Sequence, residues 1–291
     1  LGDVYKRQGE TTYTCHQRMK FYDIEFGCTG YHNDISVAGA LRVSCNIYFY
    51  ELSRRLGIDK ITEYASLYGY GQHTGIETGD YAGAIGNPET FNDIGLDWTV
   101  GQVLQAAIGQ SETSVTPLQM AGVASTIANR GVRYKTHLVD SIYDYSMENE
   151  IEKIEPEIAE TIDINYDYVY DYVIDGMVQA SENNFPADYS LSNLGFDVAI
   201  KTGTPQNWRN GGEVTDSCFI GFAPADDPQI AFAGMIEGAE YSKYMIRSII
   251  QAYYKHYSED GDFSDVKINY LDNSSKNSEN EDSAATEPTN E

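Results

Sequence analysis

The chain has 291 residues, which is long enough for one large domain or two small ones with a substantial buried core. Its formal net charge of −26 at pH 7 would repel phosphate backbones and anionic lipid headgroups, which argues against nucleic-acid binding. The sequence contains no apolar run of roughly 18 residues or more, so it predicts no transmembrane helix within the chain.

A helix is expected from Asn46 to Leu56, where apolar residues recur at helical spacing. Ser44 or Asn46 would cap its N-terminus, and Gly57 stands where a C-terminal cap belongs. A glycine-rich loop is expected to follow, from Gly69 to about Gly95.

Two further helices are predicted before the middle of the chain. One fits Val100–Ala107, opened by Asp97 or Thr99. The other fits Pro117–Asn129, with proline in its first turn and Gly131 just past its end.

The second half of the chain changes from helical to strand character. Residues Tyr145–Glu160 are acidic and polar and predict a linker or surface excursion, whereas Tyr166–Ala180 has helical spacing. Ser242–His256 is expected to close the folded part as an amphipathic helix. Between these helices, short β-rich runs predict strands at Phe196–Ile200, Ser217–Phe222 and Gln229–Ile236, the last two as an antiparallel pair.

Helices followed by a sheet and a terminal helix indicate an α+β or α/β-type fold, with an antiparallel sheet flanked by helices. Residues 1–8, LGDVYKRQ, join nothing recognisable downstream, and we expect an unrelated lead-in or artefact there, in a sequence that starts inside a gene. Residues 9–258 are expected to form the folded domain. Residues 259–291 carry ten acidic residues against two lysines and predict a disordered acidic tail.

The four cysteines, Cys15, Cys28, Cys45 and Cys218, are too few for a disulfide framework. Cys15 and Cys28 could form a disulfide in an oxidising compartment. They could also contribute to a zinc site, because His16 and His32 lie beside them in the sequence. The spacing matches no zinc motif, however, and our prediction is that the protein holds no metal.

The first chemical motif is Lys201-Thr202-Gly203-Thr204 at the end of a predicted strand. Glycine lets another backbone approach closely, while the lysine and the hydroxyls can face a bound anion. The alternative is a strand that simply runs into a turn.

The second motif is Ser44-Cys45-Asn46. Ser-x-Asn also occurs at Ser181, Ser275 and Ser278, but only Ser44 stands at the start of an apolar helix. The alternative interpretation of Ser44 is a plain helix N-cap.

In chain order, Ser44-Cys45-Asn46 and Lys201-Thr202-Gly203-Thr204 resemble the second and third motifs of the serine acyltransferases that react with penicillin, whose first motif is Ser-x-x-Lys. Three longer segments resemble class B penicillin-binding proteins: SVAGALRVSCNIYFYELSRRLGI, LQAAIGQSETSVTPLQMAGVASTIANRGV and DSCFIGFAPADDPQIAFAGMIE. The resemblance spans roughly residues 13 to 256 and implies a partial transpeptidase domain of the penicillin-binding and β-lactamase-like fold.

The resemblance implies a role for each motif residue. Ser44 would relay protons to the leaving or attacking amine, and Asn46 would hydrogen-bond an amide of the peptide stem. Lys201 would supply positive potential for the substrate carboxylate, which the hydroxyls of Thr202 and Thr204 would contact beside Gly203. The Thr204 N–H would supply half of the oxyanion hole.

One departure from the family bears on activity. The nucleophilic serine belongs upstream of Ser44, and no Ser-x-x-Lys lies there. The only match, Ser264-Asp265-Val266-Lys267, follows the third motif at the border of the acidic tail, and we interpret it as accidental. We therefore expect the polypeptide as written to be inactive in acyl transfer, because a serine nucleophile needs its adjacent base.

The resemblance implies that the complete protein is a peptidoglycan D,D-transpeptidase that cross-links stem peptides through a serine acyl-enzyme and is acylated by β-lactams. It implies no cofactor. Expected partners are D-Ala-D-Ala stem peptides, β-lactams and other cell-wall synthesis proteins, at the extracytoplasmic face of the cell membrane, with an N-terminal anchor outside this sequence. The alternatives are a non-catalytic penicillin-binding or β-lactam-sensing relative and, less favoured, a serine β-lactamase.

Overall fold

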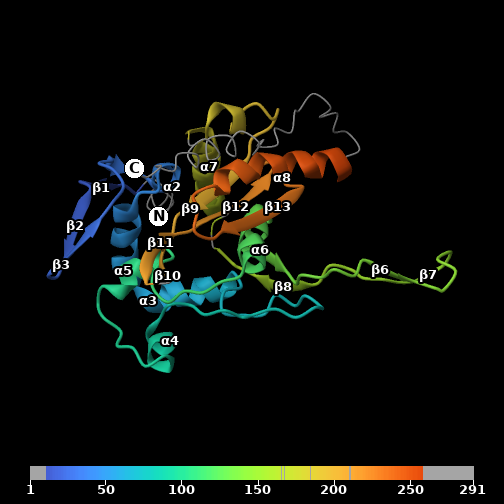
Figure 1. Ribbon diagram of the computed structural model, residues 1–291, viewed down its shortest axis with the longest axis horizontal. Coiled ribbons are helices and arrows are strands. Elements are labelled where there is room, and N and C mark those ends of the chain that lie inside the picture. Colours follow the sequence, from blue (N-terminus) through green and yellow to red (C-terminus); the bar gives the residue numbers. More distant parts are fainter. Residues whose placement is uncertain (1–10, 165, 167, 184, 210, 258–291) are drawn as a thin grey trace, which may run out of the picture. The chain divides into compact units, whose positions relative to one another are not determined.

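The computed structural model describes residues 11–164, 166, 168–183, 185–209 and 211–257 (Figure 1). The predicted lead-in and acidic tail lie outside these residues. The chain divides into two units, residues 1–247 and 248–291, and the second contributes only the end of helix α8 (Ser242–Tyr257) to the described part. Among the described helices, none combines the length and apolar character of a membrane span.

Four short strands open the first unit. β1 (Tyr13–Cys15) pairs with β4 (Asn33–Ile35), and β2 (Arg18–Phe21) forms a hairpin with β3 (Ile24–Gly27). Both pairs are antiparallel and lie beside the first helices (Figure 1). None of these strands was expected from the sequence.

Helix α2 (Val37–Val43) leads into α3 (Asn46–Leu67). At Gly57 the backbone of α3 turns to φ 77°, a conformation that favours glycine, and the helix kinks there. Gly57 therefore ends one helical segment as predicted, but a second segment follows at once. The core around α3 includes buried Ile47, Tyr48 and Leu104, the last from α5 (Gln102–Ala107).

The predicted caps had mixed outcomes. Helix α6 (Pro117–Ala128) is preceded by Thr116, which forms a reciprocal capping box with Gln119, and its C-cap is Asn129. The predicted proline start and the end near Asn129 are confirmed. Helix α5 begins after Gly101, so Asp97 and Thr99 are not its caps. A short helix, α4 (Pro88–Asp93), interrupts the loop expected to contain no helix.

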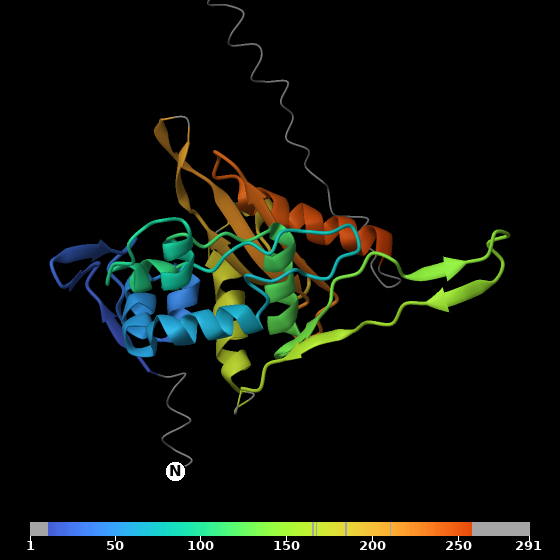
Figure 2. The same cartoon turned by 90° about the horizontal axis from the view of Figure 1, so that it is seen from below.

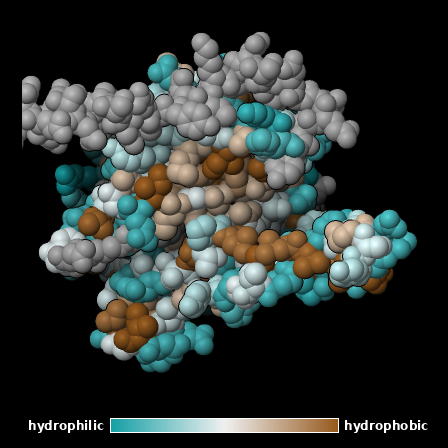
Figure 3. Space-filling model, turned by 45° about the vertical axis from the view of Figure 1, so that its right-hand side comes forward, coloured by the Kyte–Doolittle hydropathy of each residue, from teal (hydrophilic) through white to brown (hydrophobic). Residues whose placement is uncertain are grey.

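Of the two alternatives predicted for Tyr145–Glu160, a linker or a surface excursion, the structure shows the second, as a β-structured arm. β5 (Val132–Tyr134) pairs with β8 (Ile158–Thr161), and further out β6 (Ser141–Tyr143) pairs with β7 (Glu150–Lys153). The arm extends from the end of α6 (Figure 2). Apolar surface runs along it (Figure 3), including the exposed side chains of Leu138, Val139, Ile142, Ile151 and Ile158.

After α7 (Tyr168–Asn183), the chain forms an antiparallel sheet in the order β13 (Ile230–Ile236), β12 (Ser217–Ala223), β9 (Ala199–Gly203). A hairpin of β10 (Gln206–Arg209) and β11 (Gly212–Thr215) follows β9. The predicted β12–β13 pair and the terminal helix are confirmed. The mixture of helices and antiparallel sheets confirms the predicted fold class.

Helices α6 and α7 pack on the sheet. Met177 of α7 contacts Ala199 and Phe222, which lie opposite one another on β9 and β12. Because side chains alternate along a strand, this face of the sheet also carries Lys201 and Gly203 at the end of β9. The sheet thus presents the Lys-Thr-Gly motif at the edge of a packed helical layer.

Candidate active site

Ser44 lies at the corner between α2 and α3. It is the C-cap of α2, with φ 53° and ψ 52° in the left-handed region. A non-glycine residue in this conformation is uncommon and is found most often at functional sites and turns. The N-cap of α3 is Cys45, so the prediction that Ser44 or Asn46 caps this helix is wrong.

Close packing between α2 and α7 fixes the position of this corner. Gly176 of α7 faces α2, where an added Cβ would come within 2.8 Å of Ala38 Cα and 2.9 Å of Leu41 Cβ. The absence of a side chain at Gly176 therefore lets the two helices approach closely enough to bring Ser44 over the end of the sheet.

Lys201 reaches this corner from β9. Its Nζ donates a hydrogen bond to Ser44 Oγ at 2.7 Å and another to the Thr202 carbonyl oxygen at 2.5 Å. The two motifs found in the sequence, 157 residues apart, are therefore in direct contact.

The surroundings of Lys201 are poorly solvated. Burial lowers the pKa of the Lys201 ammonium from its ordinary value. Burial also raises the pKa values of the Cys218 thiol and the Tyr70 hydroxyl, which interact electrostatically with each other. Cys218 and Lys201 interact as well, and neither Cys218 nor Tyr70 was among the site residues expected from the sequence. The strand register was the available signal for Cys218, since it lies opposite Gly203.

The other predicted site residues lie at the start of α3 and at the end of β9. Asn46 Nδ2 donates to the Gly27 carbonyl oxygen at 3.3 Å, so this amide holds the end of β3 against the start of α3. Thr202 lies opposite Phe219 in the sheet register, on the face away from Lys201. Thr204 is exposed just past the end of β9. The predicted contacts of these residues with substrate stay predictions.

A family model described as "Penicillin binding protein transpeptidase domain" matches residues 7–254. The chain belongs to the penicillin-binding protein transpeptidase family. Its relatives include class B enzymes: it is 26% identical over 232 residues to the peptidoglycan D,D-transpeptidase MrdA of Acinetobacter baumannii, covering 72% of this chain and 33% of MrdA. It is 32% identical over 196 residues to the stage V sporulation protein D of Bacillus subtilis, covering 64% of this chain and 28% of that protein. The chain thus spans about a third of the length of the curated relatives it matches.

Solved penicillin-binding proteins share its fold. The structure matches PBP2 of Pseudomonas aeruginosa in complex with WCK 5153 with a TM-score of 0.72 and 25% identity, over 84% of this chain and 54% of that one. It matches PBP-2B of Streptococcus pneumoniae with a TM-score of 0.73 and 23% identity, over 87% of this chain and 45% of that one. The family and fold inferred from the sequence are therefore confirmed.

In this transpeptidase domain, the position of Gly203 has little room for a side chain, because Cys218 lies opposite it in the sheet. A Cβ at Gly203 would lie 2.7 Å from Cys218 Sγ, which is shorter than a van der Waals contact. We expect Gly203→Ala to lower the free energy of unfolding by about 1–3 kcal/mol, because the strand pair must separate or Cys218 must leave its rotamer. Urea unfolding monitored by circular dichroism measures this change.

Two companion variants separate the clash from the loss of glycine itself. Combining Gly203→Ala with Cys218→Ala should restore most of the stability, because the smaller side chain removes the clash. Gly212→Ala, in a hairpin where an added Cβ meets nothing within 4 Å, is the matched control. If both glycine variants lose the same stability, contact with Cys218 is not the cause.

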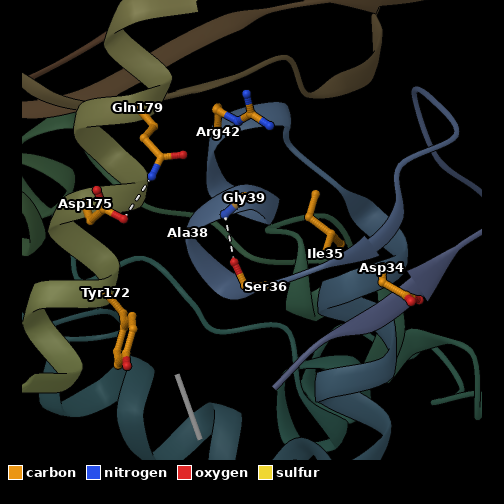
Figure 4. A pocket seen from close by; sticks show the side chains of 9 residues that line it. All are labelled: Asp34, Ile35, Ser36, Ala38, Gly39, Arg42, Tyr172, Asp175 and Gln179. Carbon is orange, nitrogen blue, oxygen red and sulfur yellow. Dashed lines mark hydrogen bonds between the residues drawn. The ribbon is translucent and has the colours of Figure 1, made fainter. Parts of the chain in front are cut away.

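A separate cavity of about 480 Å³ lies between α2 and α7 (Figure 4). Its lining combines the carboxylates of Asp34 and Asp175 with Arg42, but includes neither Ser44 nor Lys201. Gln179 donates to Asp175 at 2.9 Å across one wall. This mixed-charge cavity is therefore distinct from the Ser44–Lys201 site of the transpeptidase domain.

The described residues also hold one group of side chains with the chemistry of metal ligands, Cys15, Cys28, His32 and Cys45. The zinc alternative considered from the sequence included His16, but His16 instead interacts with the Tyr31 hydroxyl at 2.5 Å. Cys45, which that alternative omitted, completes the group. The cysteines are free in the structure, so Cys15 and Cys28 form no disulfide.

Proposed function

We propose that this chain is part of a serine-type peptidoglycan D,D-transpeptidase. The observation that carries the proposal is the hydrogen bond from Lys201 Nζ to Ser44 Oγ. It brings the second and third family motifs together at the end of the sheet, in a chain that belongs to the family. The names of relatives such as MrdA and PbpA, both peptidoglycan D,D-transpeptidases, support the reaction.

In the proposed reaction, a serine from an upstream Ser-x-x-Lys attacks the penultimate D-Ala carbonyl of a stem peptide. The peptide bond breaks, the terminal D-Ala leaves with a proton, and an acyl-enzyme forms. An amine of a neighbouring strand then attacks this ester, loses a proton and releases the serine. Ser44 Oγ would relay these protons, because it accepts a hydrogen bond from the half-buried ammonium of Lys201.

The other motif residues would bind the substrate. Lys201 would attract the terminal carboxylate, with hydroxyl contacts from Thr202 and Thr204, and Asn46 would hydrogen-bond a stem amide. The Thr204 N–H would donate to the oxyanion. In the described part of the chain, β9 pairs with β12 on one side only, so its other edge can pair with an extended peptide beside Gly203.

The same proposal includes location and partners. Peptidoglycan is assembled outside the cytoplasm, so we place the complete protein at the extracytoplasmic face of the bacterial membrane, held by an anchor outside these residues. A PBP2 of Helicobacter pylori with the same fold was solved in a complex with MreC. This complex supports other cell-wall synthesis proteins as partners.

Fluorescent penicillin tests the proposal directly. The 291-residue polypeptide is expected to remain unlabelled, because the residues before Ser44 contain no Ser-x-x-Lys. A polypeptide extended with the coding sequence upstream of Gly9 is expected to be labelled at the serine of such a motif. A D-Ala-D-Ala peptide should slow this labelling by competition.

Two results would contradict these expectations. Labelling of the 291-residue chain would show that another nucleophile serves the site. An extended chain that binds penicillin without forming a covalent bond would favour the non-catalytic relative, and rapid hydrolysis of a chromogenic cephalosporin would favour a β-lactamase.

A further inference from the structure

One buried carboxylate lies close to the Lys-Thr-Gly motif and has no role in the proposed reaction. Asp216 connects β11 to β12, and it is the only acidic or basic side chain that is buried in the described part of the chain. Burying a carboxylate is costly unless hydrogen bonds replace those lost with water. The partners of Asp216 therefore indicate what this residue does in the fold.

The strand pairs β9–β12 and β10–β11 belong to one antiparallel ladder. Gly203 lies opposite Cys218 in the first pair, and Gln206 lies opposite Thr215 in the second. The same number of residues separates these positions on both strands, so the register does not shift between the two pairs. The residues in between, which belong to neither pair, therefore also lie opposite one another.

Pro205 lies opposite Asp216 in this ladder. Asp216 N donates to the Pro205 carbonyl oxygen at 3.0 Å, and proline has no N–H with which to return a second bond. Hydrogen-bonded and non-hydrogen-bonded pairs alternate along an antiparallel ladder, so the N–H of the residue before Pro205 points away from the partner strand. Thr204 therefore directs its N–H toward the edge of β9 that no strand of the described residues covers.

The Asp216 side chain holds the same segment at a second point. Asn207 Nδ2 donates to Asp216 Oδ2, and Gly238 N donates to Asp216 Oδ1 at 2.7 Å. Gly238 lies in the turn between β13 and α8. The Asp216 carboxylate therefore ties β10 to this turn, while the Asp216 main chain binds Pro205. Together these bonds fix the segment 205–207, which directly follows Thr204.

We propose that Asp216 is a positioning residue that aims the Thr204 N–H at the oxyanion formed during acylation. This inference rests on the proposed transpeptidase function, in which Thr204 supplies half of the oxyanion hole. Asp216 acts through the peptide that follows Thr204, so that the donor needs no reorganisation when negative charge develops on the substrate. Such an interaction strengthens in the transition state and contributes little to initial binding.

Acylation kinetics test this role in the protein extended upstream to include a Ser-x-x-Lys. Asp216→Ala is expected to lower the first-order rate constant of acylation by penicillin about 10- to 100-fold, since complete removal of an oxyanion donor costs about 100- to 1000-fold. The dissociation constant of the non-covalent complex should stay within about threefold of the wild-type value. Stopped-flow measurements over a range of penicillin concentrations separate the two constants.

Two further variants distinguish positioning from a general loss of structure. The double variant Asp216→Asn/Asn207→Asp exchanges the two side chains, which keeps a carboxylate–amide hydrogen bond and an acceptor for Gly238 N. It should restore the rate constant to within about threefold of wild type. Ser217→Ala is the matched control, because Ser217 is also buried and its Oγ donates to Ala239 O, in the same turn, at 2.7 Å. This control should keep the rate constant within about threefold of wild type.

Hydrogen exchange tests the same inference without acylation. Asn207 pairs with Val214 in the β10–β11 ladder. In the 291-residue chain, Asp216→Ala should accelerate exchange of the Asn207 amide at least about 10-fold, while the amides of Phe222 and Ala231 in the β12–β13 pair keep their wild-type rates. The double variant should keep the Asn207 amide protected.

Three results would overturn the proposal: equal rate losses in Asp216→Ala and Ser217→Ala, no recovery in the double variant, or unchanged exchange of the Asn207 amide in Asp216→Ala. Weaker non-covalent binding with an unchanged rate constant would overturn it too. If the extended wild-type chain is not acylated at all, the proposed transpeptidase function fails. The exchange measurement then decides by itself whether Asp216 holds the segment after Thr204.

Discussion

Replacing Lys201 with methionine is expected to slow acylation by penicillin about 100- to 1000-fold in the protein extended upstream to include a Ser-x-x-Lys. Methionine keeps the length of the side chain but removes the charge beside Ser44 Oγ and the substrate carboxylate. Losing one preorganised electrostatic contact commonly has an effect of this size. Stopped-flow acylation rates with a chromogenic β-lactam measure it.

The free energy of unfolding distinguishes this electrostatic role of Lys201 from a structural one. Burial lowers the pKa of Lys201, which shows that the fold disfavours its charged form. The unfolded chain thus binds more protons than the folded chain between the two pKa values, so this residue contributes stability that rises with pH in that interval. We expect Lys201→Met to keep the unfolding free energy within about 1 kcal/mol of wild type, or to raise it. A large loss would mean that Lys201 mainly supports the fold.

The lowered pKa also predicts a pH profile. Acylation that needs charged Lys201 should decline in alkaline solution before the ordinary lysine value of 10.5 is reached. Lys201→Arg, although bulkier, stays charged at high pH and should not show this decline. If the wild-type and arginine proteins decline together, the titrating group is a different one.

Gln119→Leu is expected to lower the free energy of unfolding by about 2–4 kcal/mol. Gln119 is buried, and its Nε2 donates to the carbonyl oxygens of Gln72 and Ala82, both at 2.7 Å. Its Oε1 accepts from Thr116 N at 2.8 Å, which completes the capping box. Leucine fills the volume but leaves these partly buried backbone groups without the side chain that they bond.

Chemical denaturation measures this loss, and Gln229→Leu is the matched control. Gln229 is exposed, and its amide donates to Asp227 O at 3.3 Å, so its replacement should cost less than about 0.5 kcal/mol. Equal losses in the two variants would contradict the role of Gln119 as the link between α6 and the loop around Gln72. Faster proteolysis of this loop in Gln119→Leu alone would support it.

Helix boundaries were predictable where residues at the boundary itself indicate them. The first turn of α6 carries its own signals, namely Pro117 and the Thr116–Gln119 pair. Gly57 likewise marks the kink in α3 through its backbone alone. By contrast, β7 has no alternation of buried and exposed residues, because all four of its side chains are exposed. Periodicity therefore could not distinguish that strand from a linker.

The pairing of Ser44 with Lys201 in the candidate site was predictable from the family motifs, but its surroundings were not. Contact between Ser44 and Lys201 follows from the resemblance, whereas Cys218 enters through strand register. The cysteine–histidine cluster depends on the β2–β3 hairpin, which brings Cys15 and Cys28 together. Such a cluster matches no linear spacing rule, because the hairpin between its members determines the distances between their side chains.

The one-sided pairing of β9 also bears on the colloidal behaviour of the protein. A strand edge that can accept a peptide can equally accept the same strand of another molecule, which is how edge-to-edge aggregation begins. Covering the edge would prevent this but would also block the proposed substrate. Mutual repulsion between chains of net charge −26 keeps such edges apart without covering them. The acidity of the sequence thus disfavours edge-to-edge pairing at β9 without any element of the described chain pairing with that edge.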